Sequence, residues 1–265
     1  MSLPTPLSDD QVREFFEQGF TVVRGVFTPA EIAEIAAGFS RLEVLAQPLD
    51  GIVNAHGANF AVDRQPQPDG STRVAIRRVS WCGGADPVLL RYGGDPRLLA
   101  MAAQLLGSRT MNQLINQAHF KAPGDNIQFP WHQDSTHRGY GGPGWEDVNG
   151  RGSYVQLATA IDASTLENGP LLFIPGSCKH GHLGLKYTDH DWATSDKFDP
   201  ATAVPVLAEP GDVALFGPYT IHGSTPNRSK HSRRVFINGF AYPGANRKVY
   251  PGNGAGRLLA LPATL

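Results

Sequence analysis

The chain has 265 residues, of which 41% are hydrophobic and 18% charged, and its formal net charge is −1. This composition is that of an ordinary globular protein, and the near-neutral charge lacks the basic excess of nucleic-acid-binding proteins, so we expect no nucleic-acid partner. The 30 glycines and 21 prolines together make 51 of the 265 residues, or about 19%. These two residue types reach roughly 12% on average. The chain therefore turns often, which favours many short strands over a helix bundle.

The expected compartment follows from two further observations. No apolar run approaches the roughly 20 residues that span a bilayer, and the N-terminal segment is acidic where a signal peptide is basic and then apolar. We therefore expect a cytoplasmic protein without a membrane partner. The two cysteines, Cys82 and Cys178, form neither a disulfide framework nor a CxxC zinc motif. Nine histidines direct any metal chemistry toward nitrogen and oxygen ligands.

The first 110 residues predict mixed helix and strand. Capping boxes, in which a Ser or Thr is followed three residues later by Gln or Glu, occur at Ser8 and Thr28 and indicate helix starts. Residues 45–95 are rich in turn residues and predict loops and hairpins. The expected elements are a helix ending at Gly19, a strand over Phe20–Phe27, a helix from Thr28-Pro29 onward, and a helix over Pro96–Leu106.

From residue 110 onward, short apolar runs alternate with Pro, Gly, Asp and Asn, which predicts an antiparallel sandwich or barrel. Without an internal repeat or linker, we expect one domain over residues 1–265, with mixed support in 1–110 and the core in 111–245. The stretches 135–152 and 179–202 exceed normal loop length and predict lids or binding loops. The expected strands are Met111–Lys121, Ser153–Ile161, Leu171–Ile174, Ala203–Leu207, Val213–Phe216 and Arg234–Ala241.

A histidine and an aspartate, His132 and Asp134, stand two residues apart. On an extended strand both side chains point to one face and can converge on one atom. His222, at the end of a later apolar run, supplies a third ligand. Two histidines and one carboxylate with open positions are the ligand set of non-haem Fe(II) oxygenases. The alternative is a strand-end histidine hydrogen-bonded to its neighbouring aspartate.

The order and spacing of further motifs favour the metal site. With them, nearly the whole chain resembles the phytanoyl-CoA dioxygenase family of Fe(II)/2-oxoglutarate-dependent oxygenases. The resemblance implies a mainly β fold, with a double-stranded β-helix (jelly-roll, cupin-like) core and flanking N-terminal α-helices. The motifs are Leu7-Ser-Asp-Asp-Gln-Val, Gly19-Phe-Thr-Val-Val-Arg-Gly-Val-Phe, Phe120-Lys-Ala-Pro-Gly, Trp131-His-Gln-Asp, Leu166-Glu-Asn-Gly-Pro-Leu, Ile174-Pro-Gly-Ser, Pro210-Gly-Asp-Val, His222-Gly-Ser and Arg233.

The resemblance also implies roles for individual residues. His132, Asp134 and His222 would bind Fe(II). Arg233, eleven residues after His222, has the family spacing for the arginine that holds the far carboxylate of 2-oxoglutarate. Its planar guanidinium suits a carboxylate, although the adjacent Arg234 leaves the register open by one residue. Ser224 matches a position whose hydroxyl assists, and Gln117 one that touches cosubstrate or substrate.

The implied reaction uses Fe(II), 2-oxoglutarate and O2, releases succinate and CO2, and oxidises a small-molecule substrate. Relatives that halogenate have a small residue in place of the retained Asp134, which favours hydroxylation, or a related oxidative cyclisation or desaturation. The lid expected just after the ligands carries His137, Tyr140 and Trp145, which either grip the substrate or pack on the sandwich. The absence of a basic cluster argues against an acyl-CoA substrate.

We expect the substrate to be a small or medium-sized metabolite, in a tailoring step of natural-product (antibiotic) biosynthesis. The alternatives are a cupin-like isomerase or sensor that binds metal without turning over 2-oxoglutarate, and a zinc hydrolase. Neither has a use for the arginine and serine that would hold a carboxylate. The sequence leaves the oligomeric state open.

Overall fold

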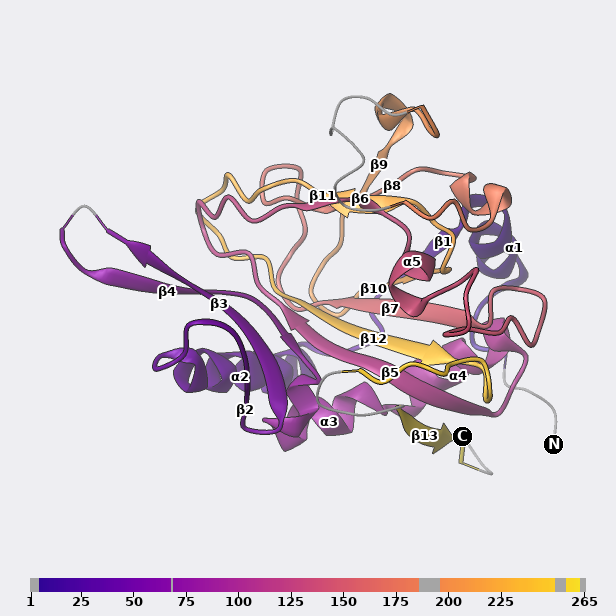
Figure 1. Cartoon of the computed structure of the whole chain (residues 1–265), viewed down its shortest axis with the longest axis horizontal. Coiled ribbons are helices and arrows are strands. Elements are labelled where there is room, and N and C mark those ends of the chain that lie inside the picture. The colour runs from indigo at the N-terminus through magenta and orange to yellow at the C-terminus, as the bar shows by residue number, and fades with distance from the viewer. Residues whose placement is uncertain (1–4, 68, 186–195, 251–255, 263–265) are drawn as a thin grey trace.

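Two antiparallel sheets face each other in the computed structural model (Figure 1), which describes residues 5–67, 69–185, 196–250 and 256–262. In the larger sheet the order is β1-β10-β7-β12-β5-β4-β3-β2, with β13 beside β5; in the smaller it is β6-β11-β8-β9. This is a mainly β, jelly-roll fold, as predicted. The strands are β1 Phe20–Val23, β2 Gly51–Ala55, β3 Ala58–Pro66, β4 Thr72–Ser80, β5 Thr110–His119, β6 Phe129–His132, β7 Tyr154–Ala160, β8 Leu171–Phe173, β9 Val204–Val206, β10 Val213–Phe216, β11 His222–Ser224, β12 Val235–Ala241 and β13 Arg257–Ala260.

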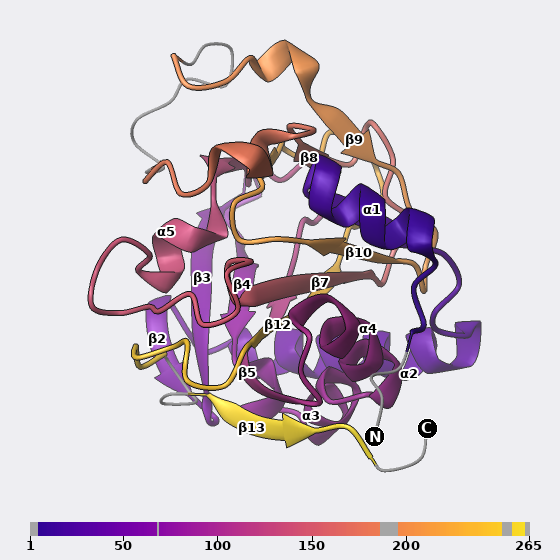
Figure 2. The ribbon, with the colours of Figure 1, turned by 90° about the vertical axis from the view of Figure 1, so that its right-hand side faces the viewer.

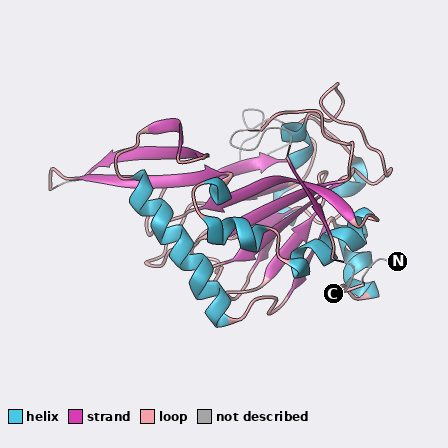
Figure 3. Ribbon diagram, turned by 90° about the horizontal axis from the view of Figure 1, so that it is seen from below, coloured by secondary structure: helices cyan, strands magenta, loops and turns pink. Residues whose placement is uncertain are grey.

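Helices cover the outer face of the larger sheet. Seen from below (Figure 3), α2 (Pro29–Ala46), α3 (Pro87–Gly93) and α4 (Pro96–Leu106) lie across it. Strand β12 shows how alternation separates two cores: Phe236 and Phe240 pack in the cluster shared with the helices, whereas Val235 and Ile237 belong to the cluster between the sheets. The inner face is therefore the side on which a site between the sheets forms.

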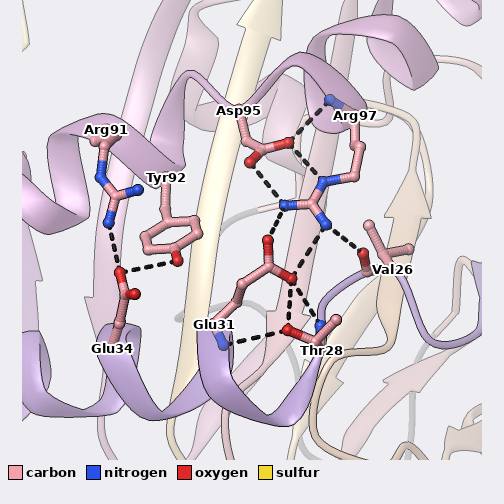
Figure 4. Close-up of polar contacts among 8 residues, drawn as sticks. All are labelled: Val26, Thr28, Glu31, Glu34, Arg91, Tyr92, Asp95 and Arg97. Carbon is pink, nitrogen blue, oxygen red and sulfur yellow. Dashed lines mark hydrogen bonds and ion pairs between the residues drawn. The ribbon is translucent and has the colours of Figure 1, made fainter.

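The helix starts follow the predicted caps. Both capping boxes are formed, at Ser8 for α1 (Asp9–Gln18) and at Thr28 for α2. Glu31, the acidic member of the second box, also accepts from Arg97 at 2.6 Å, which joins the start of α2 to the start of α4 (Figure 4). Helix α1 contacts β1 and lies at the end of the molecule that faces the viewer in Figure 2.

Among the expectations for the first 110 residues, one strand bound needs correction, and the hairpins expected within residues 45–95 are present. The strand expected over Phe20–Phe27 ends at Val23, because Gly25 turns the chain with φ +62° and Arg24 pairs with Asp212 at 2.7 Å. Residues 51–80 form a meander, β2-β3-β4, that extends the larger sheet beyond the rest of the fold (Figure 1). The sequence interpretation also missed α3, although Asp86 caps it just before Pro87.

All six strands expected after residue 110 are present, with bounds that differ by at most two residues. The larger sheet takes strands from both sides of residue 110, and a single domain over 1–265 stays a prediction. Of the two expected lids, 135–152 contains helix α5 (Asp134–Arg138) and an ordered loop, and part of 179–202, residues 186–195, lies outside the described residues. None of the helices in the described ranges is long and apolar enough to cross a membrane.

Candidate metal centre and cosubstrate pocket

The two histidines of the predicted ligand set meet across a strand pair. His132 at the end of β6 is the register partner of His222 at the start of β11, and their ring centroids lie 4.1 Å apart. Asp134 completes the group: the ligand atoms of the three residues lie within 4.8 Å of one another, and all three side chains are buried. Residues 90 positions apart in sequence thus form one compact donor set.

Asp134 reaches this point by a different route from the one expected. The sequence predicted that Asp134 shares an extended strand with His132. In the structure, β6 ends at His132 and Asp134 is the first residue of α5. The intervening Gln133 fixes the transition from strand to helix. Its buried amide donates to the carbonyls of Tyr219 and Gly181, at 2.7 and 2.8 Å, and its oxygen accepts from Leu183 N at 2.8 Å.

The hydrogen bonds of the donor set prepare it for a cation. Nδ1 of His132 lies 2.8 Å from the Pro130 carbonyl, and Nδ1 of His222 lies 2.9 Å from that of Thr220. A carbonyl only accepts, so each Nδ1 carries the proton and the lone pair is on Nε2. Oδ2 of Asp134 is buried without a hydrogen-bond partner. Burial, together with His222 and His137, lowers the pKa of His132 well below its usual value. Two imidazoles whose Nε2 atoms point away from these carbonyls and an unsatisfied carboxylate fit a divalent metal ion.

A cavity of about 480 Å³ opens onto this centre, and it contains most of the predicted site residues. Its wall combines apolar side chains of the inner sheet faces with polar and cationic ones. The lining includes His132, Asp134, His222, Gln117, His119, Ser224, Arg233, His137, Arg78, Arg138, Gln156, Lys248 and Tyr250.

Two buried basic side chains, Arg233 and Lys121, stand side by side, and Arg233 lines the cavity. Arg233 and Lys121 are paired through both backbone hydrogen bonds, at 2.9 and 3.2 Å, so their side chains share the inner face. They are 3% and 1% exposed. The Arg233 guanidinium donates through Nε and Nη2 to the Gly169 carbonyl. None of the ion pairs found among the described residues includes either cation. Burial lowers the pKa of Arg233 to about 10, and burial together with Arg233 lowers that of Lys121 to about 6.

Ser224 lies beside these cations. Its Oγ accepts from Lys121 Nζ at 2.7 Å, and the lysine also donates to the Thr225 carbonyl. Gln117 donates to Ser80 Oγ at 3.4 Å and lies 2.9 Å from Nε2 of His119. Burial, with nearby cations, lowers the pKa of His119 to about 3. These neutral and cationic groups form a pocket for an anion next to the metal ligands.

Arg234 occupies the opposite face. Its guanidinium pairs with Asp162 at 2.8 and 2.9 Å, and it does not line the cavity. The side chain that faces the centre is therefore that of Arg233.

The three candidate substrate residues separate. His137 lines the cavity, with its ring centroid 5.4 Å from that of His132. Tyr140 and Trp145 lie outside it: their rings stack 4.8 Å apart in the core between the sheets, and Tyr140 Oη and Trp145 Nε1 both donate to the Gly152 carbonyl. The structure thus favours the packing alternative for these two aromatic residues.

Sequence reasoning overlooked several cavity residues. His119 is the clearest case, because Ile115, Gln117 and His119 alternate along β5, so the period of two would have placed it beside Gln117. Arg138 follows Asp134 by four residues, so helical spacing would have placed the two side chains on one face. Arg78 and Lys248 come from segments whose pairing with the core no local pattern indicated.

A jelly roll with a buried His-Asp-His centre and an adjacent anion pocket defines the class of non-haem iron oxygenases. Known proteins resemble this chain in sequence and in fold. The chain is 25% identical over 262 residues to L-proline trans-4-hydroxylase of Streptomyces griseoviridis, covering 89% of this chain and 87% of that one. The structure resembles EvdO2 of Micromonospora carbonacea var. aurantiaca complexed with 2-oxoglutarate (TM-score 0.65, 22% identity, 95% and 98% covered). It also resembles EctD from S. alaskensis with bound Fe (TM-score 0.65, 24% identity, 89% and 77% covered).

The sequence model of the phytanoyl-CoA dioxygenase (PhyH) family matches residues 15–235. The chain belongs to this family. It is an Fe(II)- and 2-oxoglutarate-dependent dioxygenase, an oxidoreductase that uses O2 and acts on a small molecule.

Proposed function

We propose that His132, Asp134 and His222 hold the Fe(II) ion and that Arg233 and Ser224 bind the far carboxylate of 2-oxoglutarate, with Gln117 on the wall beside it. The supporting observation is the position of the buried, carboxylate-free Arg233 next to a donor set whose Asp134 oxygen has no partner. His137 is the candidate substrate contact. The product is a hydroxylated small or medium-sized metabolite, and a setting in natural-product biosynthesis stays a prediction. We propose a cytoplasmic enzyme without nucleic-acid or membrane partners.

Bound Fe(II) with 2-oxoglutarate and O2 supplies the oxidation. The chain itself contributes orientation and charge. The carbonyls of Pro130 and Thr220 fix both imidazole planes, and Gln133 fixes the turn that aims Asp134. Arg233 offers a fork of donors to a carboxylate, which fixes the cosubstrate in one direction. Buried walls around the centre exclude bulk water from the reacting carbon.

The isomerase, sensor and hydrolase alternatives lack support from this pocket. A zinc hydrolase needs a general base close to the metal, and within the described cavity lining Asp134 is the single carboxylate and belongs to the donor set. The buried Arg233 guanidinium donates to the Gly169 carbonyl and forms none of the ion pairs found among the described residues; an anionic cosubstrate gives it a partner.

Anaerobic titration of the Fe(II)-loaded protein with 2-oxoglutarate tests the proposal. We expect the weak visible charge-transfer band of the chelate in the parent, and its loss, together with succinate formation, in His132→Ala and Asp134→Ala. Activity that survives in both variants would place the metal elsewhere.

Arg233→Gln and Arg234→Gln form a matched pair, because the two arginines are adjacent but face opposite ways. Loss of a two-point charged contact, at about 1.5 to 3 kcal/mol for each hydrogen bond, predicts at least a hundredfold higher Kd for 2-oxoglutarate in Arg233→Gln. Arg234→Gln should bind the cosubstrate as the parent does. Equal affinities in the two variants would refute the assignment.

A further inference from the structure

Cations also line the part of the cavity that lies away from Arg233. Arg138 and Lys248 contribute to the wall there, and Arg78 also lines the cavity. The Arg138 guanidinium lies 5.3 Å from the centre of the Tyr154 ring, and Tyr154 pairs with Ala241, eight residues along the chain from Arg233.

Arg138 is held in an unusual environment. It is 6% exposed, its guanidinium lies between the rings of Tyr154 and Tyr250, at 5.3 and 5.0 Å, and its Nε is buried without a hydrogen-bond partner. The ion pairs found among the described residues do not include it, whereas the half-buried Arg234 has Asp162. The carboxylate that acts on this guanidinium is that of Asp134, which belongs to the metal donor set. Because a buried cation without its own partner is costly, an anion from outside the chain would complete this site.

Lys248 adds a second positive charge next to Arg138. Its Nζ donates to the His137 carbonyl at 2.7 Å, which ties the segment after β12 to helix α5. Burial and the charge of Arg138 lower the pKa of Lys248. A bound anion would relieve the repulsion between the two cations.

Counting charge gives the same result for the whole cavity. The described lining carries four cations, Arg78, Arg138, Arg233 and Lys248, against one carboxylate, Asp134. Fe(II) and the 2-oxoglutarate dianion cancel each other, so binding both leaves this excess in place. The remaining occupant, the substrate, is the group that can neutralise it.

We propose that Arg138 and Lys248 bind an anionic group of the substrate, and that the substrate is a small organic acid carrying a carboxylate, phosphate, phosphonate or sulfate. This inference rests on the proposed function. Asp134 and Arg138 are four residues apart on α5, so they lie on one face about one helical turn apart. The acid group is therefore held within a few bonds of the carbon that reacts at the iron.

The test uses enzyme loaded with Fe(II) and saturated with 2-oxoglutarate without oxygen. Sodium sulfate is the tetrahedral probe and sodium acetate the planar one, each titrated at an ionic strength held constant with sodium chloride. The melting temperature and the charge-transfer band are followed. We expect a saturable rise in melting temperature with at least one probe, and the better probe identifies the acid class.

The variants Arg138→Gln and Lys248→Met should each weaken binding of that probe at least tenfold and change the 2-oxoglutarate Kd less than twofold. Arg247→Gln is the control, because Arg247 is exposed and pairs with Glu146 outside the cavity. This control should bind the probe and 2-oxoglutarate as the parent does.

Lys248→Met keeps the test valid if Arg138→Gln does not fold. Parent-like probe binding in both variants, or no saturable response to either probe, overturns the inference while the 2-oxoglutarate band upholds the proposed function. Absence of that band in the parent refutes the proposed function and this inference with it.

A substrate screen gives a second readout. Succinate release is measured with small organic acids and with their methyl esters. Acids should be turned over and their esters not, and Arg138→Gln should lower kcat/KM at least tenfold for the acid. An ester turned over as well as its acid, with kcat/KM unchanged in Arg138→Gln, overturns the inference.

Discussion

Replacement of Lys121 by methionine tests whether this buried lysine is neutral in the folded protein. The Lys121 side chain is 1% exposed and lies beside Arg233, and burial together with that arginine lowers its pKa to about 6. The unfolded chain keeps the ordinary lysine value of about 10.4. Between these two values the unfolded state binds a proton that the folded state does not, so wild-type stability rises with pH. The Lys121→Met variant lacks this pH-dependent contribution to the unfolding free energy. The unbranched methionine side chain keeps the aliphatic packing of the lysine.

The size of the effect follows from the pKa difference. Each pH unit in the window contributes about 1.4 kcal/mol. From pH 6, where the folded lysine is half protonated, to pH 8, the wild type should gain about 2 kcal/mol relative to the variant. Other titrating groups cancel, because they are common to both proteins.

Urea unfolding at pH 6, 7 and 8 measures this difference. The control is Lys230→Met, which removes an exposed lysine and should leave the pH dependence unchanged. The difference in unfolding free energy between wild type and Lys121→Met could instead stay constant within about 0.5 kcal/mol from pH 6 to pH 8. That result would show that Lys121 remains charged in the folded protein, and it would refute the argument for a neutral lysine beside Arg233.

Three further outcomes are expected. Tyr140→Phe loses the hydroxyl that donates to Gly152 and should cost about 1 kcal/mol of stability with kcat/KM unchanged; a selective loss of kcat/KM would restore the substrate-gripping role. Arg97→Met removes the partner that lowers the pKa of Glu31 to about 2 and should cost about 1 kcal/mol at pH 7. Because a lowered carboxylate pKa stabilises above about 4.5, this cost should shrink as pH falls below that value in acid unfolding; a cost independent of pH would contradict it. Ser224→Ala should raise the 2-oxoglutarate Kd about fivefold, and an unchanged Kd would show that its hydroxyl serves only Lys121.

Local signals predicted the elements that depend on local chemistry. The capping boxes at Ser8 and Thr28 satisfy backbone donors within one helical turn, so their sequence spacing is enough to find them. The apolar runs after residue 110 likewise predicted six of the nine strands described there. The meander β2-β3-β4 was left unordered because hairpin pairing depends on register with β5, in which Ser80 lies opposite Gln117, and no local pattern contains that information.

The candidate site divides in the same way. His132, Asp134, His222 and Arg233 were identified through a ligand type and a resemblance, but the geometry that joins them was not. The turn at Gln133, held by carbonyls of Tyr219 and Gly181, is a long-range feature. Arg138 was missed because its significance depends on two tyrosines, one of them more than 100 residues away in sequence, that flank it in space.

The alternation of β12 explains how one strand serves both stability and chemistry. Phe236 and Phe240 face the helices and anchor the larger sheet, whereas Arg233, Val235 and Ile237 face the cavity. A substitution on the inner face changes the surroundings of the iron and the cosubstrate without removing a contact from the helical core. A shift of one residue in register would exchange the two faces and bury Arg234 against the metal centre in place of Arg233. The pairing of Arg234 with Asp162 on the outer face opposes that shift, so an ion pair remote from the iron helps to keep the correct arginine in the pocket.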